Sequence, residues 1–336
     1  MSFPSDLSPL ACPQRPLQLV LVGTSLESES DQVVRAGLAV ARAARARVYL
    51  VHGAEIQPPL VGFEPGPNLA LARELLAARE EKLRQQIERL DIGAAELAGK
   101  AVLSGAPHRL LTETAGKVGA GLIVVGATGS GPLSAELLGS TADRVLRKAA
   151  CPVLVVRGEL RVPPRRVLTP VDLSTLSGDA FRCGLHLLAQ IATAGETDVR
   201  AVYALSFLDT LQRRKQGKIS SEELERYSAE ELRRFVLENR PSDLPFEVET
   251  AVLSGEARFE LLDELKEHPV DLVVLGTHGR GGLDRLMLGS VASTIARKAP
   301  CSVLLISPEA ALAEAIGEAV TARTTPAWHR EPAPVA

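Results

Sequence analysis

Short, nearly continuous apolar runs alternate along this chain with longer amphipathic stretches. The runs LQLVLVG (17–23), ARVYLVHG (46–53) and GLIVVG (121–126) have the length of strands and are rich in Val, Leu and Ile. Such runs are typical of strands buried on both faces of a sheet. Between them, SDQVVRAGLAVARAAR (30–45) repeats apolar residues at helical spacing. Alternating strands and helices predict a doubly wound, Rossmann-like α/β fold with a parallel sheet.

The second half of the chain repeats the first. Residues 126–156 and 276–306 align without a gap, and fourteen of the 31 pairs are identical, too many for two unrelated segments. Upstream, VLSGAP at 102 matches VLSGEA at 252, and RAGLAVA at 35 matches RCGLHLL at 182. A repeat of this length predicts two copies of one five-stranded domain.

The repeat sets the expected domain boundaries. The first domain covers 17–157 and the second covers 164–307, with a polar, proline-containing linker at 158–163. Residues 1–16 lack the basic region and apolar core of a signal peptide, and we expect a short disordered leader. Residues 308–336 have no partner in the first copy. They predict a tail that is partly helical and then disordered, in which Trp328 is either unengaged or a docking anchor.

Composition narrows the classes of function. A net charge of -3 argues against a general nucleic-acid binder, which needs a basic surface. No apolar run approaches the roughly 18 residues of a membrane span. The cysteines form no CxxC pair, which favours a reducing, cytoplasmic location. Cys151 and Cys301 occupy matching positions, and we interpret them as small buried residues at strand starts, with a redox pair as the alternative.

Glycines follow the fourth strand of each copy, where ligands bind in parallel sheets. In the second copy this strand ends at Gly276, and Gly289-Ser290 then opens a helix. Glycine permits a close approach of the backbone and a positive φ. The free N–H groups at a helix start favour an anion such as phosphate, and Ser290 can either cap the helix or donate to that phosphate. Ordinary turns without a ligand also carry such glycines.

Both copies share the spacing Gly, two residues, Gly, nine residues, Gly-Ser. This spacing resembles the nucleotide-binding signature of the universal stress protein family. The resemblance runs from Leu17 to Ser307 in two copies and includes VDLS (171–174) and ARKAPCSVLLI (296–306). The chain thus resembles a tandem universal stress protein. The resemblance implies an adenine nucleotide as ligand, ATP, with Mg²⁺ as an optional companion.

Carried over residue by residue, the resemblance assigns a complete site to the second copy. It implies that Asp172 meets the nucleoside and that glycines surround the ribose and phosphates. The chemistry agrees, because a carboxylate accepts hydrogen bonds from ribose or adenine but repels phosphate. Arg280 adds charge to a phosphate or is a solvated loop residue. The expected residues are Pro170, Asp172, Ala204, Gly276, Gly279, Arg280, Gly289, Ser290 and Val291.

The first copy departs from this pattern. Ser25 aligns with Asp172, so the nucleoside carboxylate is replaced by a hydroxyl without charge or a second acceptor. Losing such a contact weakens binding by about 1–3 kcal/mol, and the second copy is therefore expected to be the better site. The residues expected to form the weaker site are Ser25, Gly126, Gly129, Gly139, Ser140 and Thr141.

No catalytic motif accompanies these residues. The chain has no GxxxxGK[ST] loop and no GxSxG elbow, and His278, which lies in the glycine loop, belongs to no catalytic motif. We expect an ATP-responsive stress protein that is not an enzyme. An interaction or small-ligand module without nucleotide is an alternative, favoured by the degenerate first copy. A slow ATPase is a third hypothesis.

The last apolar run of each copy, PVLVV (152–156) and SVLLI (302–306), is expected at a sheet edge. An exposed apolar edge requires a partner. The resemblance implies that these strands pair between domains, and a tandem chain can make that pair within one molecule. A further homodimer stays open.

Overall fold

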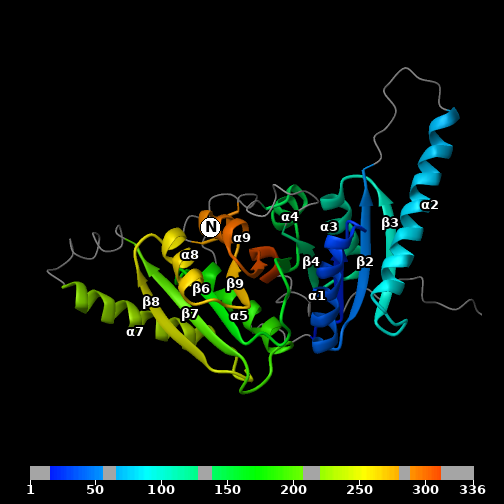
Figure 1. Cartoon of the computed structure of the whole chain (residues 1–336). Coiled ribbons are helices and arrows are strands. Elements are labelled where there is room, and N and C mark those ends of the chain that lie inside the picture. The colour runs from blue at the N-terminus through cyan, green and yellow to red at the C-terminus, as the bar shows by residue number, and fades with distance from the viewer. Residues whose placement is uncertain (1–15, 56–65, 128–137, 207–219, 280–287, 312–336) are drawn as a thin grey trace, which may run out of the picture.

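The computed structural model describes residues 16–55, 66–127, 138–206, 220–279 and 288–311. Within these ranges the chain forms two α/β domains, shown in Figure 1. The expected leader lies outside the described residues except for its last residue, Pro16. The tail beyond 311 also lies outside them, and its first residues, 308–311, are helical.

The elements follow the order that the apolar runs predict. The first domain contains β1 (Leu19–Gly23), α1 (Ser28–Ala44), β2 (Arg47–Ala54), α2 (Gly66–Arg89), β3 (Leu97–Ser104), α3 (Pro107–Val118), β4 (Leu122–Gly126), α4 (Ser140–Leu146) and β5 (Val153–Val156). The second contains β6 (Arg166–Val171), α5 (Thr175–Ala189), β7 (Asp198–Leu205), α7 (Ser221–Asn239), β8 (Val248–Ser254), α8 (Ala257–Glu267), β9 (Leu272–Gly276), α9 (Ser290–Lys298) and β10 (Ser302–Ile306).

The strands form one ten-stranded sheet in the order β3-β2-β1-β4-β5-β10-β9-β6-β7-β8. Within each domain all pairs are parallel and follow the doubly wound order, so the predicted fold class is confirmed. The central strands are apolar throughout because helices cover both of their faces, and the first four residues of β4 and β9 are fully buried.

Two apolar layers enclose the sheet. One joins alternate strand residues to α1, α2, α5 and α7, and the other joins the opposite residues to α3, α4, α8 and α9. Both layers run through both domains, as the side-by-side arrangement in Figure 1 suggests. Each layer is therefore shared, and the two repeats have a common interior.

The seam between the domains is the pair β5–β10. It is the one antiparallel pair among the described strands, with Leu304 opposite Leu154 and Val303 opposite Val155. The two apolar fifth strands thus cover each other instead of facing solvent. This arrangement relates the domains by an approximate twofold axis through the seam.

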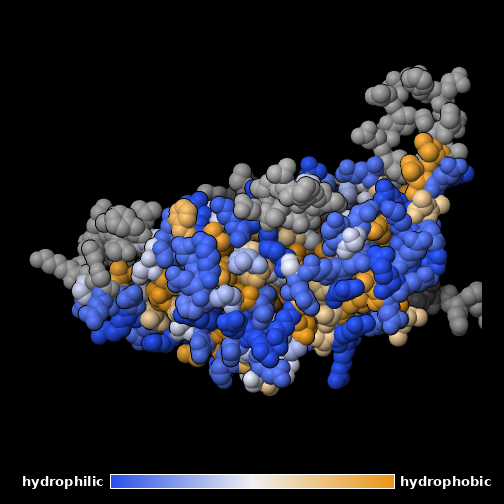
Figure 2. Space-filling model, viewed as in Figure 1, coloured by the Kyte–Doolittle hydropathy of each residue, from blue (hydrophilic) through white to orange (hydrophobic). Residues whose placement is uncertain are grey.

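The surface is otherwise ordinary for a globular domain. Hydrophilic residues cover most of the face in Figure 2, and an apolar patch lies at the end of α2 that projects from the sheet. Two leucines of α2, Leu71 and Leu75, are 54% and 44% exposed. In the described part of the chain, no helix has the length and apolarity needed to cross a bilayer.

Cys151 and Cys301 lie at opposite ends of the seam. Antiparallel register puts Cys151 opposite Ser307 and Cys301 opposite Arg157, so the two cysteines are roughly 20 Å apart along the strands. A disulfide needs Cα atoms within about 7 Å. Burial raises the pKa of the Cys151 thiol to about 12 and that of Cys301 to about 11. Both observations favour the interpretation as buried structural residues.

We expect these two thiols to be inert in the folded protein. Iodoacetamide at pH 8 should label them quickly only after denaturation, because the native thiols hold their protons. Peptide mapping by mass spectrometry measures the labelling. A Cys151–Cys301 disulfide after mild oxidation of the native chain would contradict the register described above.

Candidate functional site

Two loops of the second domain meet at one end of the sheet. β6 and β9 are neighbours, with Leu168 opposite Val273, so the residues that follow them emerge side by side. Asp172 comes directly after β6, and Gly279 lies three residues after β9. The structure therefore brings together the two predicted groups that lie more than 100 residues apart in sequence.

The carboxylate of Asp172 uses its two oxygens differently. The backbone N–H of Ser174 donates to Oδ1 at 3.0 Å, and the Ser174 hydroxyl donates to the same oxygen at 2.6 Å. The other oxygen faces Gly279 so closely that a Cβ built at residue 279 would lie 2.2 Å from Oδ2. Oδ1 thus fixes the turn that follows β6, and Oδ2 faces the glycine loop.

Close contacts also explain the other glycines of the loop. A Cβ at Gly276 would lie 3.0 Å from the Ala180 methyl, and one at Gly289 would lie 3.0 Å from the Thr277 carbonyl oxygen. None of these three glycines has φ in the left-handed range, so the positive φ that glycine permits is not used here. Space, rather than backbone handedness, requires glycine here.

The helix that follows the loop begins as predicted, but with a different cap. Gly289 is the N-cap of α9, with φ −55° and ψ 150°, and no side chain caps the helix. Ser290 is the first helical residue, so the interpretation of Ser290 as the cap is wrong. The N–H groups of Ser290, Val291 and Ala292 have no acceptor within the helix and point to the end where the loops meet. An anion would satisfy them.

The loop itself is anchored to the sheet. The N–H of Thr277 donates to Ile306 O at 2.9 Å, and the N–H of Gly289 donates to Thr277 O at 2.8 Å. The Thr277 hydroxyl lies 2.9 Å from His278 Nδ1, which ties that imidazole to the loop. These bonds hold the start of α9 beside the end of β9.

The remaining predicted residues lie around this point. Pro170 and Ala204 are half-buried residues of the paired strands β6 and β7, near the ends from which Asp172 emerges. Val291 is the second residue of α9 and is partly buried. Arg280 lies outside the described residues.

In the first domain the turn after β1 corresponds to the turn at Asp172, but a serine hydroxyl replaces the carboxylate. The N–H of Glu27 donates to Ser25 Oγ at 3.4 Å, as the N–H of Ser174 does to Asp172. The next residue, Leu26, has φ 68°, which matches φ 63° at Leu173. Ser25 is exposed, and among the described residues its single side-chain oxygen accepts only this hydrogen bond of the turn. No second acceptor is left to face a glycine loop.

The glycine half of the first domain is retained. Gly126 ends β4, and Gly139 is the N-cap of α4, with its N–H donating to Ala127 O at 2.7 Å. Ser140 is the exposed first residue of α4, and Thr141 follows it. Gly129 lies outside the described residues. The first domain thus keeps the helix start and lacks the carboxylate.

A buried polar network, which the sequence analysis missed, occupies the first domain beside this turn. The Thr24 hydroxyl donates to Gln86 Oε1 at 2.9 Å, and Gln86 Nε2 donates to Ser30 Oγ at 3.1 Å and to Asp31 Oδ1 at 2.7 Å. Gln86 is fully buried. In the second domain the Phe235 ring of α7 packs against the Phe181 ring of α5, with the ring centroids 5.8 Å apart. Polar and aromatic contacts therefore fasten the corresponding helices in the two copies.

The surroundings lower the pKa values of two groups beside this network, Asp31 and His52. The Arg89 guanidinium, bonded to Asp31, holds the pKa of that carboxyl below its ordinary value. Burial lowers the pKa of His52, whose Nδ1 lies 2.9 Å from the Thr24 carbonyl oxygen. That oxygen only accepts, so neutral His52 carries its proton on Nδ1. The network is structural and has no group placed for catalysis.

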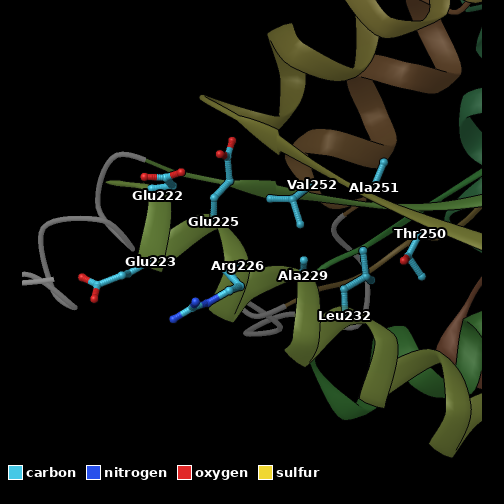
Figure 3. Close-up of a pocket in the computed structure, with 9 residues that line it drawn as sticks. All are labelled: Glu222, Glu223, Glu225, Arg226, Ala229, Leu232, Thr250, Ala251 and Val252. Atoms are coloured by element: carbon cyan, nitrogen blue, oxygen red, sulfur yellow. The ribbon is translucent and has the colours of Figure 1, made fainter. Parts of the chain in front are cut away.

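A cavity of about 690 Å³ lies elsewhere, between α7 and the edge strand β8. Figure 3 shows its lining, with Thr250 and Val252 of the strand pointing toward the helix and Ala251 pointing to the other side of the strand. The α7 side carries Glu222, Glu223 and Glu225. Carboxylates repel phosphate, so this cavity does not suit a nucleotide. The glycine loop is the better candidate because it combines a nucleoside acceptor with a helix N-terminus.

Comparison with known proteins agrees with the repeat. The family model described as the universal stress protein family matches residues 17–157 and again 164–307. The chain belongs to the universal stress protein family. It is a tandem member, since the two matches cover the two domains.

Relatives of similar length support this assignment. A universal stress protein of Mycolicibacterium smegmatis is 30% identical over 310 residues, which is 86% of this chain and 97% of that protein. The crystal structure of a universal stress protein from Archaeoglobus fulgidus has a TM-score of 0.58 at 16% identity, covering 86% of this chain and 98% of that one. A functionally unknown Pseudomonas aeruginosa protein has a TM-score of 0.57 at 19% identity, covering 92% and 98%. The structural matches support the fold.

The contact between Asp172 and Gly279 generates a prediction about stability. Gly279→Ala should cost about 1–3 kcal/mol in urea unfolding, because Ser174 holds the carboxylate and prevents it from turning away from the new methyl. In an Asp172→Ala background the same change should cost clearly less.

Gly116→Ala is the matched control, because nothing lies within 4 Å of a Cβ at this position in α3. It should stabilise the chain by about 0.5–1 kcal/mol through helix propensity. If Gly279→Ala costs the same with and without Asp172, the carboxylate is not the group that requires glycine.

Proposed function

We propose that the second domain binds ATP and that the protein acts as a nucleotide-responsive stress protein rather than as a catalyst. One observation carries this proposal. Asp172, a nucleoside acceptor, faces the same glycine loop that leads into the free N-terminus of α9. An adenine nucleotide needs both groups at one place, an acceptor for its hydroxyls or base and donors for its phosphates.

In this proposal each end of the nucleotide meets a different chemistry. Asp172 accepts hydrogen bonds from the ribose or adenine, with Pro170 and Ala204 beside the base. The N–H groups of α9 and the Ser290 hydroxyl donate to the phosphates, and Arg280 adds positive charge. Mg²⁺, where it accompanies ATP, is held by the phosphates in the usual way of hard cations.

Regulation is favoured over catalysis because the sequence has no GxxxxGK[ST] loop and no GxSxG elbow beside the glycine loop. Hydrolysis of ATP is therefore proposed to be slow at most. The absence of a CxxC pair suits a reducing cytoplasm. A homodimer of the tandem chain is compatible with this role.

The first domain is proposed to be the weaker site or to bind no nucleotide. The one side-chain oxygen of Ser25 accepts the hydrogen bond from Glu27 N–H that forms the turn. A hydroxyl in place of a charged acceptor lowers nucleotide affinity by one to two decades, on the order of 1–3 kcal/mol.

The experiment compares matched variants of the two turns. ATP binding to the full-length protein is measured by calorimetry, and nucleotide released from denatured protein is identified by chromatography. Asp172→Ala should weaken ATP binding by about tenfold or more, and Ser25→Ala should change it by less than about twofold.

Two results would count against the proposal. Wild-type protein that neither retains nucleotide nor binds ATP at millimolar concentration contradicts the function. Equal effects of Asp172→Ala and Ser25→Ala contradict the ranking of the domains. Steady phosphate release that disappears in His278→Ala would instead support an ATPase.

A further inference from the structure

The helix that starts at the candidate phosphate site ends against the other domain. The last turn of α9 presents the carbonyl oxygens of Ala296 and Arg297 to Arg157, which follows β5 in the first domain. Arg157 Nη2 donates to these oxygens at 3.2 and 3.0 Å. Cationic donors at a helix C-terminus satisfy its last carbonyls and complement its negative end. One residue of the first domain thus caps a helix of the second.

Arg157 is itself held in place by the seam. Its N–H donates to Ser302 Oγ at 3.1 Å, and the Ser302 hydroxyl lies 3.3 Å from its carbonyl oxygen. Ser302 is 1% exposed and begins β10. Burial lowers the pKa of the Arg157 guanidinium, which nevertheless stays charged as arginine does in proteins. The cap is therefore anchored to the strand pair that joins the domains.

A second contact joins α9 to the first domain, this time to helix α4. Arg297, near the end of α9, donates through Nη2 to Asp143 Oδ1 of α4 at 3.2 Å. Arg147 also bonds to Asp143, with its Nε 2.9 Å from Oδ2. The pKa of the Asp143 carboxyl is lowered, first by Arg147 and also by Arg297. Asp143 is ionised and links α4 to α9 across the seam.

These contacts do not follow the twofold symmetry of the repeat. Ser307 stands in the position of Arg157, and Ser293 stands in that of Asp143. The Ser307 hydroxyl donates to Ala149 O, just beyond α4, at 3.2 Å. The Arg297–Asp143 pair joins both helices, so the asymmetry lies in the other contact: Arg157 donates to the end of α9, whereas the Ser307 hydroxyl donates to the region after α4. The helix that receives the charged cap belongs to the domain that has Asp172.

We propose that the first domain positions the nucleotide site of the second through Arg157, with Asp143 as a second support. This inference rests on the proposed function. α9 has nine residues and is about 13 Å long, so a shift at its end moves its N-terminus as one body. Arg157 is a positioning residue for phosphate. Linkage requires the reverse effect as well. Nucleotide bound in the second domain strengthens the contacts of α9 with Arg157 and with Asp143 of α4.

The test measures ATP affinity and hydrogen exchange on the full-length chain. Arg157→Met, which keeps side-chain length, should weaken ATP binding by about threefold to tenfold. Without nucleotide it should speed amide exchange in the last turn of α9. Arg157→Lys should recover most of the affinity, because an ammonium still donates to the helix end.

Ser307→Ala is the matched control, since it removes the symmetry-related contact on the side of α4. It should leave ATP affinity within about twofold of wild type. If wild type binds ATP and Arg157→Met binds it equally well, the positioning role is overturned and the proposed function stands. If Ser307→Ala weakens binding as much as Arg157→Met, general loosening of the seam replaces the specific role. Absence of ATP binding in wild type overturns the function and this inference together.

Discussion

The antiparallel pairing of β5 with β10 is the constraint on which the rest of the molecule depends. Each five-stranded sheet ends in a short apolar strand whose backbone groups and side chains cannot be left facing water. Pairing these two strands joins the sheets and continues both apolar layers through the chain. It also sets α4 and α9 against each other, because each helix immediately precedes one of the paired strands. The β5–β10 pair thus determines both how the domains contact each other and where the helix at the candidate site lies.

Duplication within one chain lets the two copies diverge without loss of that pairing. The second copy keeps Asp172, whose second oxygen faces the glycine loop, and fastens its outer helix with Phe235 on Phe181. The first copy has Ser25 and a buried amide network around Gln86. In the proposed function, ligand binding and support of the ligand-binding helix are divided between two domains of one fold.

Much of the architecture could be predicted because strong local signals agree. Apolar runs without alternation indicated buried parallel strands, and the repeat showed that the pattern occurs twice. The run DVRAVYAL predicts a strand over the same residues as β7. The resemblance to the family assigned Asp172 and the glycine loop to one site, and the structure places Asp172 beside Gly279. The inferences about strands and repeats needed only periodicity, repeat length and the rule that parallel strands present their carboxyl ends at one edge.

Contacts between distant side chains could not be predicted in this way. Thr24 meets Gln86 across 62 residues and Arg157 meets Arg297 across 140, and no local pattern marks either pair. Of the two roles open to Ser290, capping is excluded because Gly289 already provides the extended cap conformation. The close approach that glycine permits is observed at Gly276, Gly279 and Gly289, next to atoms that only the folded chain brings near.

We propose that two copies of one fold hold one good nucleotide site. The stoichiometry of ATP binding to the full-length chain, measured by calorimetry at protein concentrations above the dissociation constant, decides this. We expect one strong site per chain, with any second binding event weaker by at least about tenfold. Saturation at two equivalent sites of equal affinity would overturn the proposal.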